Sequence, residues 1–419
     1  MKKRFLLSIA AMLLMMPQVL KADGFPRYYE LVQETEDLES GKYYIIAAVP
    51  DNLESLTNRI AYNGIDTDNH YGRAARVSVP ATYIIDIGST EKHAVPLKFI
   101  KNGEKWNLYD ESVNTNQLIG VNSDTESSSG SQHYMLTGNN NNNDLFLWYI
   151  TVSSGIATIQ IQKSINNIYY LRYDSNNYND PTSFFRVYSL TDNKLRVMLY
   201  KEMKTVTATT SFTGHGTLYY SKEVLMVPDG VTAKTYTLGE NKDKVNSHVT
   251  YGPGSFIPAN SAVVLYGATT TYPLTTTYTF PVTNRHNPDR DVKNILLGLD
   301  NGGETTTGKG ATEDAKYYFY KLTTKNNVAE TVGFYWAVNE GKAFTSAAHK
   351  AYLAVEKDVA ANIRSFLLDS SETTSISNIS LPTQEGSEWV YDLSGRRVST
   401  SQPLPKGIYI SNGKKFVVK

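Results

Sequence analysis

The sequence contains no cysteine among its 419 residues. This excludes disulfides, thiolate metal sites, iron–sulfur ligation and a cysteine nucleophile. It also excludes attachment to a membrane through a lipid-modified N-terminal cysteine. A chain of this length is expected to form two or three domains, each large enough to hold a hydrophobic core.

Net charge is absent as well, because 41 basic side chains balance 41 acidic ones. The balance is uneven along the chain. Residues 1–22 hold four basic groups and no acid, which leaves 37 basic and 41 acidic side chains, or −4, in the remainder. Six basic residues and no acid follow residue 392, so residues 23–392 carry −10. No nucleic-acid partner is expected, since nothing drives the whole chain toward polyanions.

Long hydrophobic runs are confined to the N-terminus. Lys2, Lys3 and Arg4 precede the apolar run Phe5–Leu20, which has 16 residues. A transmembrane helix needs roughly 20 apolar residues, so residues 1–22 are predicted to be a secretory signal peptide cleaved before Asp23. An uncleaved N-terminal anchor is the alternative. No transmembrane helix is expected after removal of the signal, and the protein is expected to be exported.

Recognisable catalytic motifs are also missing. The seven histidines show no H-x-x-x-H or H-x-H spacing, and no G-x-S-x-G, P-loop or G-x-G-x-x-G pattern occurs. Asp66–Asn69 offers oxygen ligands of the kind calcium prefers, but the glycine and glutamate of an EF-hand do not follow. No catalytic residue, metal site or cofactor is predicted. A polysaccharide hydrolase stays an alternative, because the separation of two catalytic carboxylates depends on the fold and not on sequence spacing.

Strand-like segments dominate the rest of the chain. They are short, β-branched and aromatic, and turn residues bound them. These segments are Tyr43–Val49, Ala81–Asp86, Leu145–Val152, Ala157–Gln162, Arg196–Tyr200, Ser261–Tyr266 and Val332–Val338. Helical periodicity is scarce, with one short helix predicted at Val355–Ile363. The fold class is therefore predicted to be mostly β, with antiparallel sheets.

Three similar segments recur in the first half of the chain: RIAYNG, QLIGVN and YYLRYD. Their central apolar residues are Tyr62, Ile119 and Leu171, which lie 57 and 52 residues apart. Three such units suit a β-trefoil, in which no unit buries its own apolar face. Another closed barrel or a sandwich is favoured over the trefoil.

Polar, turn-rich stretches predict the domain boundaries. Residues 23–203 are predicted to form an N-terminal β domain, barrel or trefoil-like, and residues 204–370 a central antiparallel β-sandwich. A linker at 371–388 precedes a small C-terminal β module at 389–419.

Tyrosine is abundant, with 30 residues, alongside four tryptophans. Flat aromatic rings with a polar edge stack on sugar faces, so Trp106, Tyr109, Trp148 and Tyr149 are candidate carbohydrate-binding residues. The alternative is that these rings pack a core, as aromatic residues in strands commonly do.

The C-terminus carries an ordered pattern, V-Y-D-L-x-G-R-R-V, then L-P-K-G-I-Y-I, then N-G-K-K-x-V-V-K, in which Asn-Gly is a favoured hairpin turn. The pattern resembles the C-terminal sorting domain of secreted Bacteroidetes proteins. The resemblance implies recognition by the type IX secretion apparatus and display at the cell surface. The motif residues are Tyr391, Asp392, Leu393, Gly395, Arg396, Arg397, Gly407, Tyr409, Asn412, Gly413, Lys414, Lys415 and Lys419.

The central region resembles a β-rich module that recurs in exported Bacteroidetes proteins. The matching stretches are Gly214–Tyr236, Phe256–Gly267, Asn294–Gly298, Val332–Phe344 and Lys350–Val355. Together these features predict a non-enzymatic β protein at the cell surface or outside the cell, or in the periplasm if the C-terminal module is not recognised. Its expected partner is a glycan or a host surface protein. A structural or adhesive surface component is the alternative.

Overall fold

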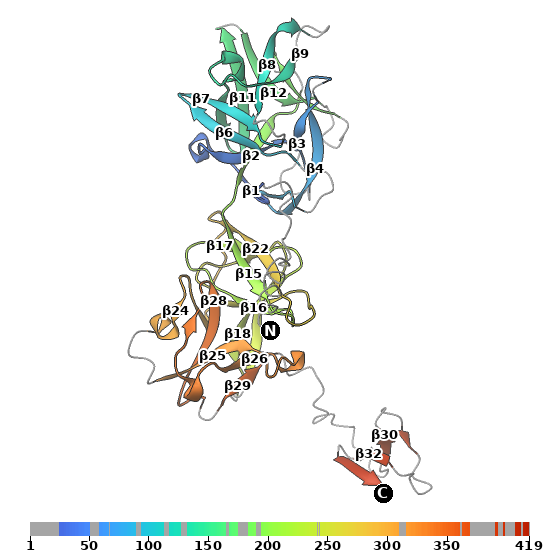
Figure 1. Ribbon diagram of the computed structural model, residues 1–419, viewed down its shortest axis with the longest axis vertical. Coiled ribbons are helices and arrows are strands. Elements are labelled where there is room, and N and C mark those ends of the chain that lie inside the picture. Colours follow the sequence, from blue (N-terminus) through green and yellow to red (C-terminus); the bar gives the residue numbers. More distant parts are fainter. Residues whose placement is uncertain are drawn as a thin grey trace, which may run out of the picture.

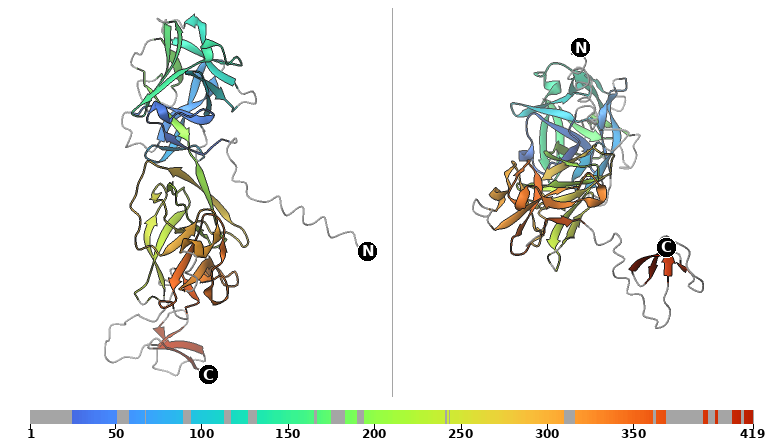
Figure 2. Two further views of the ribbon diagram at one scale, coloured as in Figure 1. Left: turned by 90° about the vertical axis from the view of Figure 1, so that its left-hand side faces the viewer. Right: turned by 60° about the horizontal axis from the view of Figure 1, so that its bottom comes forward.

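The computed structural model of the chain describes residues 25–50, 58–66, 68–88, 94–112, 117–126, 132–164, 167–174, 183–189, 194–240, 242, 244–309, 316–360, 363–368, 390–392, 397–398, 407–411 and 414–418. Two large β domains are stacked end to end, the first coloured blue to green and the second yellow-green to orange (Figure 1). The side view shows the same stacking (Figure 2). The predicted mostly β, antiparallel fold class is confirmed.

The first domain is one antiparallel sheet that curls on itself. Its strands are β1 (Tyr28–Leu31), β2 (Lys42–Ala48), β3 (Asn58–Asp66), β4 (Tyr71–Ala81), β5 (Ile84–Asp86), β6 (Leu97–Asn102), β7 (Lys105–Asp110), β8 (Gln117–Glu126), β9 (Gln132–Gly138), β10 (Tyr149–Ser153), β11 (Ile156–Ser164), β12 (Asn167–Tyr173), β13 (Phe185–Tyr188) and β14 (Val197–Glu202). Two 3-10 turns, η3 (Thr35–Asp37) and η4 (Asp144–Phe146), lie between them.

Six of these strands close into a barrel. β2 pairs with β6, β6 with β7, β10 with β11, β11 with β14, and β14 with β2. The remaining contact between neighbouring barrel strands, β7 and β10, is made by Trp106 and Trp148. Their backbones exchange hydrogen bonds of 2.7 and 2.8 Å. Closure in this order removes the free sheet edges of the barrel.

Three hairpins, β3–β4, β8–β9 and β12–β13, cover this barrel. They join one another where Phe185 pairs with Gly72 and Val187 pairs with His133. Each hairpin is flanked in the chain by two barrel strands, which gives three units of four strands. This is the arrangement of a β-trefoil, whereas the sequence favoured another closed barrel or a sandwich.

The recurring residues occupy matching places in the three units. Tyr62, Ile119 and Leu171 lie on β3, β8 and β12, the first strand of each hairpin, and each is 1% exposed in one shared core. A unit alone leaves these side chains against water, so the burial that stabilises the domain requires all three units.

The barrel strand β2 is apolar on both faces. Tyr44 and Ile46 point into the barrel core, whereas Ile45 and Ala47 pack into a second cluster. That cluster is covered by β1, which pairs with β14 and β5 outside the barrel. Coverage on both faces explains why this strand is a continuous apolar run rather than an alternating one.

The second domain contains two larger antiparallel sheets and one pair of short strands. The eight-stranded sheet consists of β15 (Thr205–Thr210), β16 (His215–Leu218), β17 (Val224–Met226), β18 (Thr232–Leu238), β19 (Val245–Tyr251), β20 (Phe256–Ile257), β21 (Val263–Tyr266) and β22 (Thr276–Thr283). The five-stranded sheet consists of β23 (Leu296–Leu299), β25 (Tyr317–Thr323), β26 (Gly333–Trp336), β28 (Lys350–Glu356) and β29 (Ser365–Leu367). The remaining elements are β24 (Gly303–Glu304), β27 (Thr345–Ser346) and the 3-10 turns η5 (Thr305–Gly308), η7 (Ala329–Thr331) and η8 (Asn339–Gly341).

The two larger sheets pack face to face. β21 shows this clearly, because Val263 and Leu265 lie in the core on one side of the eight-stranded sheet while Val264 lies in the cluster shared with the five-stranded sheet. A hydrogen bond of 3.1 Å from the backbone nitrogen of Ala351 to the Thr217 hydroxyl joins β28 to β16. The sheets separate beyond this contact, which places a cavity between them.

The two large domains share a buried apolar contact. Tyr28 and Ile84 of the first domain pack against Met226 of the second, and each of the three is 1% exposed or less. The backbone nitrogen of Met203 donates a hydrogen bond of 3.0 Å to the carbonyl of Tyr28 at the crossing between the domains. Burial of this kind stabilises the junction because apolar surface leaves water.

The C-terminal module forms a separate four-stranded sheet, in the order β31-β30-β32-β33. Its strands are β30 (Val390–Asp392), β31 (Arg397–Val398), β32 (Gly407–Ser411) and β33 (Lys414–Val418). The predicted small β module is therefore confirmed. The predicted signal peptide and the linker at 371–388 lie outside the described residues.

Two local predictions are wrong. Val355 belongs to β28, and after it the chain makes a single turn in which Ala360 bonds to the Glu356 carbonyl, instead of the predicted helix. The predicted strand Leu145–Val152 begins with the 3-10 turn η4, which Asn143 starts by accepting a hydrogen bond from the Leu145 nitrogen. Within the described residues no helical segment has the length and apolar character needed to span a membrane.

Candidate ligand-binding cavity

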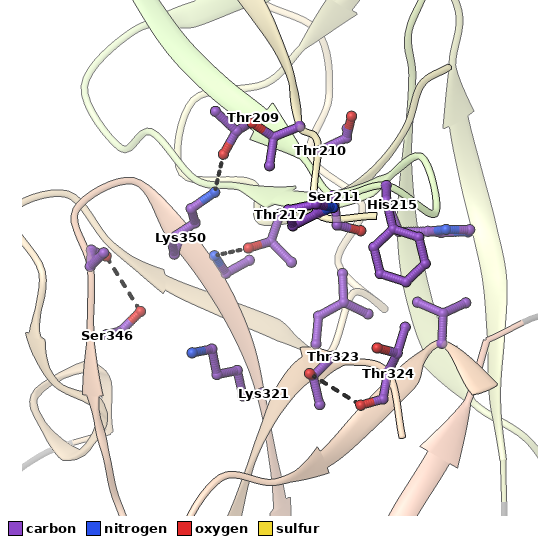
Figure 3. A pocket seen from close by; sticks show the side chains of 18 of the residues that line it. Thr209, Thr210, Ser211, His215, Thr217, Lys321, Thr323, Thr324, Ser346 and Lys350 are labelled. Atoms are coloured by element: carbon purple, nitrogen blue, oxygen red, sulfur yellow. Dashed lines mark hydrogen bonds between the residues drawn. The ribbon is translucent and has the colours of Figure 1, made fainter. Parts of the chain in front are cut away.

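A cavity of about 440 Å³ lies in the second domain, where the eight-stranded and five-stranded sheets separate. Its wall combines hydroxyl side chains, two lysines and aromatic rings. The hydroxyl residues that line it are Thr209, Thr210, Ser211, Thr217, Thr275, Thr323, Thr324, Thr345 and Ser346. Figure 3 shows most of these side chains arranged around one space.

The hydroxyls of one wall come from strand β15, whose sequence TVTATT alternates exposed and buried residues. Thr209 is on the exposed face, whereas Thr210 is fully buried, and its hydroxyl has no hydrogen-bond partner within the described part of the chain. The strand packs closely on β16 because Gly216 faces it. A Cβ at Gly216 would lie 2.3 Å from the Thr209 carbonyl oxygen, so the approach requires glycine.

The mouth of the cavity carries an aromatic pair. Tyr272 and Phe212 both line the cavity, and their rings meet edge to face at 5.2 Å. Tyr272 is 56% exposed, although large aromatic side chains generally bury most of their surface. The backbone nitrogen of Thr270 donates a hydrogen bond of 2.8 Å to the Phe212 carbonyl, which holds the Tyr272 loop against the turn after β15.

Two lysines enter the cavity from the five-stranded sheet. Lys350 begins β28, and its Nζ donates a hydrogen bond of 3.4 Å to the Thr209 hydroxyl, whereas Lys321 lies on β25 (Figure 3). Burial lowers the pKa of Lys350, and the positive charge of Lys321 lowers it further. No carboxylate is among the described residues that line the cavity. Glu304 accepts a hydrogen bond from Thr345 but is not part of the lining.

His215 lines the cavity at the start of β16. Its Nδ1 lies 2.8 Å from the Thr213 carbonyl, and its ring meets Tyr266 edge to face at 4.7 Å. Within the described residues, no carboxylate lines this cavity to orient the His215 ring for acid–base work.

The predicted carbohydrate residues of the first domain are not on one surface. Trp106 and Trp148 are 6% and 0% exposed, and the Trp148 Nε1 donates a hydrogen bond of 2.7 Å to the Ile119 carbonyl. Both rings pack the trefoil core, so a sugar-stacking role for these two residues is not supported. Tyr109 and Tyr149 are half-buried, and the Lys105 ammonium lies 5.1 Å from the centre of the Tyr149 ring.

The segment considered for calcium folds into a turn. The Asp66 carboxylate accepts hydrogen bonds from the backbone nitrogens of Asp68 and Asn69, at 3.1 and 2.9 Å. These bonds lower the pKa of Asp66, which serves the turn rather than a cation. No group of three or more metal-ligating side chains was found among the described residues.

A second hollow, also of about 440 Å³, lies at the junction of the two domains and contains several carboxylates. Burial raises the pKa of Glu30, whereas a hydrogen bond from Lys201 lowers that of Glu39. Each carboxylate has a partner: Glu39 lies 2.9 Å from Lys201, and Glu30 accepts from Thr283 at 2.5 Å. The Glu30–Thr283 contact joins the two domains, whereas the Glu39–Lys201 contact lies within the first domain.

The residues of the sorting-like motif fall on the C-terminal sheet where they are described. Tyr391 and Asp392 lie on β30, Arg397 on β31, Gly407 and Tyr409 on β32, and Lys414 and Lys415 on β33. Tyr409 is 7% exposed and pairs with Asp392 and Phe416 across the sheet. Leu393, Gly395, Arg396, Asn412, Gly413 and Lys419 lie outside the described residues.

Sequence reasoning did not find the cavity. Thr209 and Lys350 are 141 residues apart in the chain, and nothing local marks them as neighbours. The one local signal is the repeated threonine of β15, which places hydroxyls on a single strand face.

No protein-family model matches the chain, and no curated protein matches it. Among solved structures, the fold is similar to a GH43 β-1,3-galactosidase, with a TM-score of 0.27 and 15% identity over 42% of this chain and 29% of that one. It is also similar to a mosquitocidal holotoxin, with a TM-score of 0.28 and 11% identity over 76% of this chain and 34% of that one. The chain spans about a third of the length of these structures. Both scores are too low to decide a fold or a function.

Proposed function

We propose that the protein is an exported, non-enzymatic binding protein of the cell surface or the extracellular space, and that a carbohydrate is its ligand. The observation that carries this proposal is the cavity of the second domain, which combines hydroxyl-lined walls with the exposed ring of Tyr272 at its mouth. A flat ring with a polar edge suits the apolar face of a sugar, and hydroxyls exchange hydrogen bonds with sugar hydroxyls.

The size of the cavity supports a small ligand or one end of a longer chain. Its 440 Å³ falls within the roughly 300–1,000 Å³ typical of small-molecule sites. Residues from four separate segments form its wall, among them Thr209, Tyr272, Lys321 and Lys350, and folding the domain brings them together. A wall made by packed sheets is largely preformed, which lowers the ordering cost of binding.

The chemistry of the wall supports the proposal of a binding role rather than a catalytic one. Sugar hydrolysis generally uses two carboxylic acids, and none lines this cavity within the described residues. The Nδ1 of His215 is directed to the Thr213 carbonyl at 2.8 Å. The ammonium of Lys350 and the surrounding hydroxyls bind a ligand but provide no paired acid and base.

Binding is tested with the chain from residue 23 to residue 419 on a glycan array, followed by titration calorimetry. Tyr272→Ala is expected to weaken the affinity for the captured glycan about tenfold, because the stacking surface is removed. Leu274→Ala is the matched control: Leu274 lies on the same loop and is 53% exposed, but it does not line the cavity. Equal affinities of the two variants, or the absence of any captured glycan, would contradict the proposal.

Export and surface display are proposed from the N-terminal signal pattern and the sorting-like C-terminal sheet. Deletion of Trp389–Lys419 is expected to leave the protein in the periplasm, because the segment that the type IX apparatus would recognise is lost. Cell fractionation and surface protease accessibility measure this. Unchanged surface display would show that the sorting assignment is wrong, while the binding proposal would be unaffected.

A structural or adhesive role is the second candidate, and one observation favours it. Strand β19 forms one edge of the eight-stranded sheet, and five of its seven residues are not buried, among them the exposed Asn246, Ser247 and His248. An open edge pairs readily with a strand of another molecule. Concentration-dependent association in analytical ultracentrifugation, reduced when Asn246→Lys adds a charge to this exposed edge, would favour assembly over ligand binding.

A further inference from the structure

Resting on the proposed carbohydrate binding, we infer that the cavity selects an anionic sugar, one that carries a carboxylate or a sulfate group. Lys350 and Lys321 face the anionic group, and the threonine and serine hydroxyls face the ring hydroxyls. The shared chemistry is a negatively charged oxygen group on a polyhydroxylated ring. A neutral sugar would leave the two ammonium groups without a counterion.

The charge of the cavity is the first observation that supports this inference. Two lysines line it, and no aspartate or glutamate does so within the described residues. By contrast, Lys42, Lys105 and Lys201 each lie within 3.0 Å of a carboxylate oxygen. Among the described residues, the lining of the cavity provides no such carboxylate for its two lysines.

The burial of Lys350 is the second observation that supports this inference. Its ammonium is half-buried and has the neutral Thr209 hydroxyl at 3.4 Å as its recorded hydrogen-bond partner. A partly desolvated charge without a counterion is costly, and burial together with Lys321 lowers its pKa. A bound anion removes part of this cost, so the free protein already contains the charge to which the ligand is complementary.

The surrounding hydroxyls are the third observation that supports the inference, because they would distinguish a sugar acid from an anion that has no sugar ring. Thr209, Thr275 and Thr323 are exposed residues whose side chains line the cavity. The Thr217 hydroxyl accepts one hydrogen bond from Ala351 and keeps its own hydrogen to donate. A polyhydroxylated ring satisfies such groups, whereas inorganic phosphate alone fills little of a 440 Å³ cavity.

The test is titration calorimetry of the chain from residue 23 to residue 419 with matched saccharides. A galacturonic acid trimer is compared with a neutral galactose trimer, and galactose 6-sulfate with galactose. The first pair tests a carboxylate and the second tests a sulfate. Inorganic phosphate, added as a competitor, tests binding of a bare anion.

At least one acidic saccharide is expected to bind about tenfold or more tightly than its matched comparison, and added salt should reduce the difference. Lys350→Gln and Lys321→Gln should each weaken binding of that saccharide about tenfold while leaving the neutral sugar unchanged. Lys325→Gln is the control, because Lys325 follows the same strand but does not line the cavity. Lys321 is exposed, so its substitution tests the inference even if Lys350→Gln fails to fold.

The outcomes separate this inference from the proposed function. Equal binding of charged and neutral saccharides, with no effect of either lysine substitution, would overturn the anionic assignment and leave carbohydrate binding intact. Binding of none of the saccharides would overturn both. Binding of phosphate alone, as tight as that of any saccharide, would also overturn the inference, because it would show an anion site without sugar recognition.

Discussion

The two large domains use their aromatic residues in opposite ways. In the trefoil, Trp148 is 0% exposed and its indole nitrogen bonds to the backbone, so the ring fills a core built by three units. In the second domain, Tyr272 is 56% exposed at the mouth of a cavity. This difference indicates that abundant aromatic residues are typical of strands in general. Only an aromatic residue that is exposed beside a cavity indicates a binding surface.

The largest effect on stability is expected in the core of the trefoil, the first of the two regions compared. Trp148→Ala removes a fully buried ring from the trefoil core and should lower the free energy of unfolding by about 3–5 kcal/mol, because a cavity remains. Urea denaturation followed by circular dichroism measures the loss, with Trp148→Phe as the milder control. A loss below about 1 kcal/mol would mean that the ring does not support the core.

An intermediate effect is expected at a polar contact of the second domain. Burial alone would raise the pKa of Asp291, but hydrogen bonds from the Thr235 hydroxyl at 2.6 Å, His248 at 2.8 Å and the Lys293 nitrogen lower it. Because the folded pKa lies below the unfolded value of 3.8, this contribution to stability is present above pH 3.8 and disappears as the pH falls further.

Asp291→Asn should therefore lower the free energy of unfolding by about 1–2 kcal/mol at pH 7, where the Asp291 side chain is charged and 3% exposed. The difference from the unsubstituted protein should shrink at pH 3, where the carboxyl group is protonated in the unfolded chain. Urea denaturation at both pH values measures it. A difference that is the same at the two pH values would show that charge at Asp291 is not responsible.

The smallest effect on stability is expected at the rim. Tyr272→Ala should change the free energy of unfolding by less than about 0.5 kcal/mol, because more than half of the side chain is already in water. Thermal unfolding of this variant beside Leu274→Ala checks the expectation. A large destabilisation by Tyr272→Ala alone would show that the Tyr272 ring packs a core, as the trefoil tryptophans do. It would contradict the difference between the two domains.

The three-fold repeat of the trefoil was visible in the sequence because its information is local and repeated, although the sequence favoured another closed barrel or a sandwich over a trefoil. Tyr62, Ile119 and Leu171 recur at similar spacing, and each is buried at the matching place of its unit. Turn geometry repeats with them: Gly41, Gly103 and Gly155, each just before the first barrel strand of a unit, all have positive φ. Three copies of one pattern limit the topologies that can bury it.

The candidate site was not predictable for the opposite reason. Lys321, Lys350 and Tyr272 lie in separate stretches, and only the packing of two sheets brings them around one space. Trp106 and Tyr272 are both large aromatic residues with a polar edge, although one is 6% exposed and the other 56%. Exposure depends on which face of a strand or loop is covered, and residue type alone does not determine it.

The most direct test of the central claim is a crystal structure of the chain from residue 23 to residue 419 bound to an acidic oligosaccharide. The account predicts the sugar in the cavity of the second domain, with its charged group within hydrogen-bond distance of Lys350 or Lys321 and a ring against Tyr272. A sugar bound instead on the trefoil, beside Tyr109 and Tyr149, would contradict it.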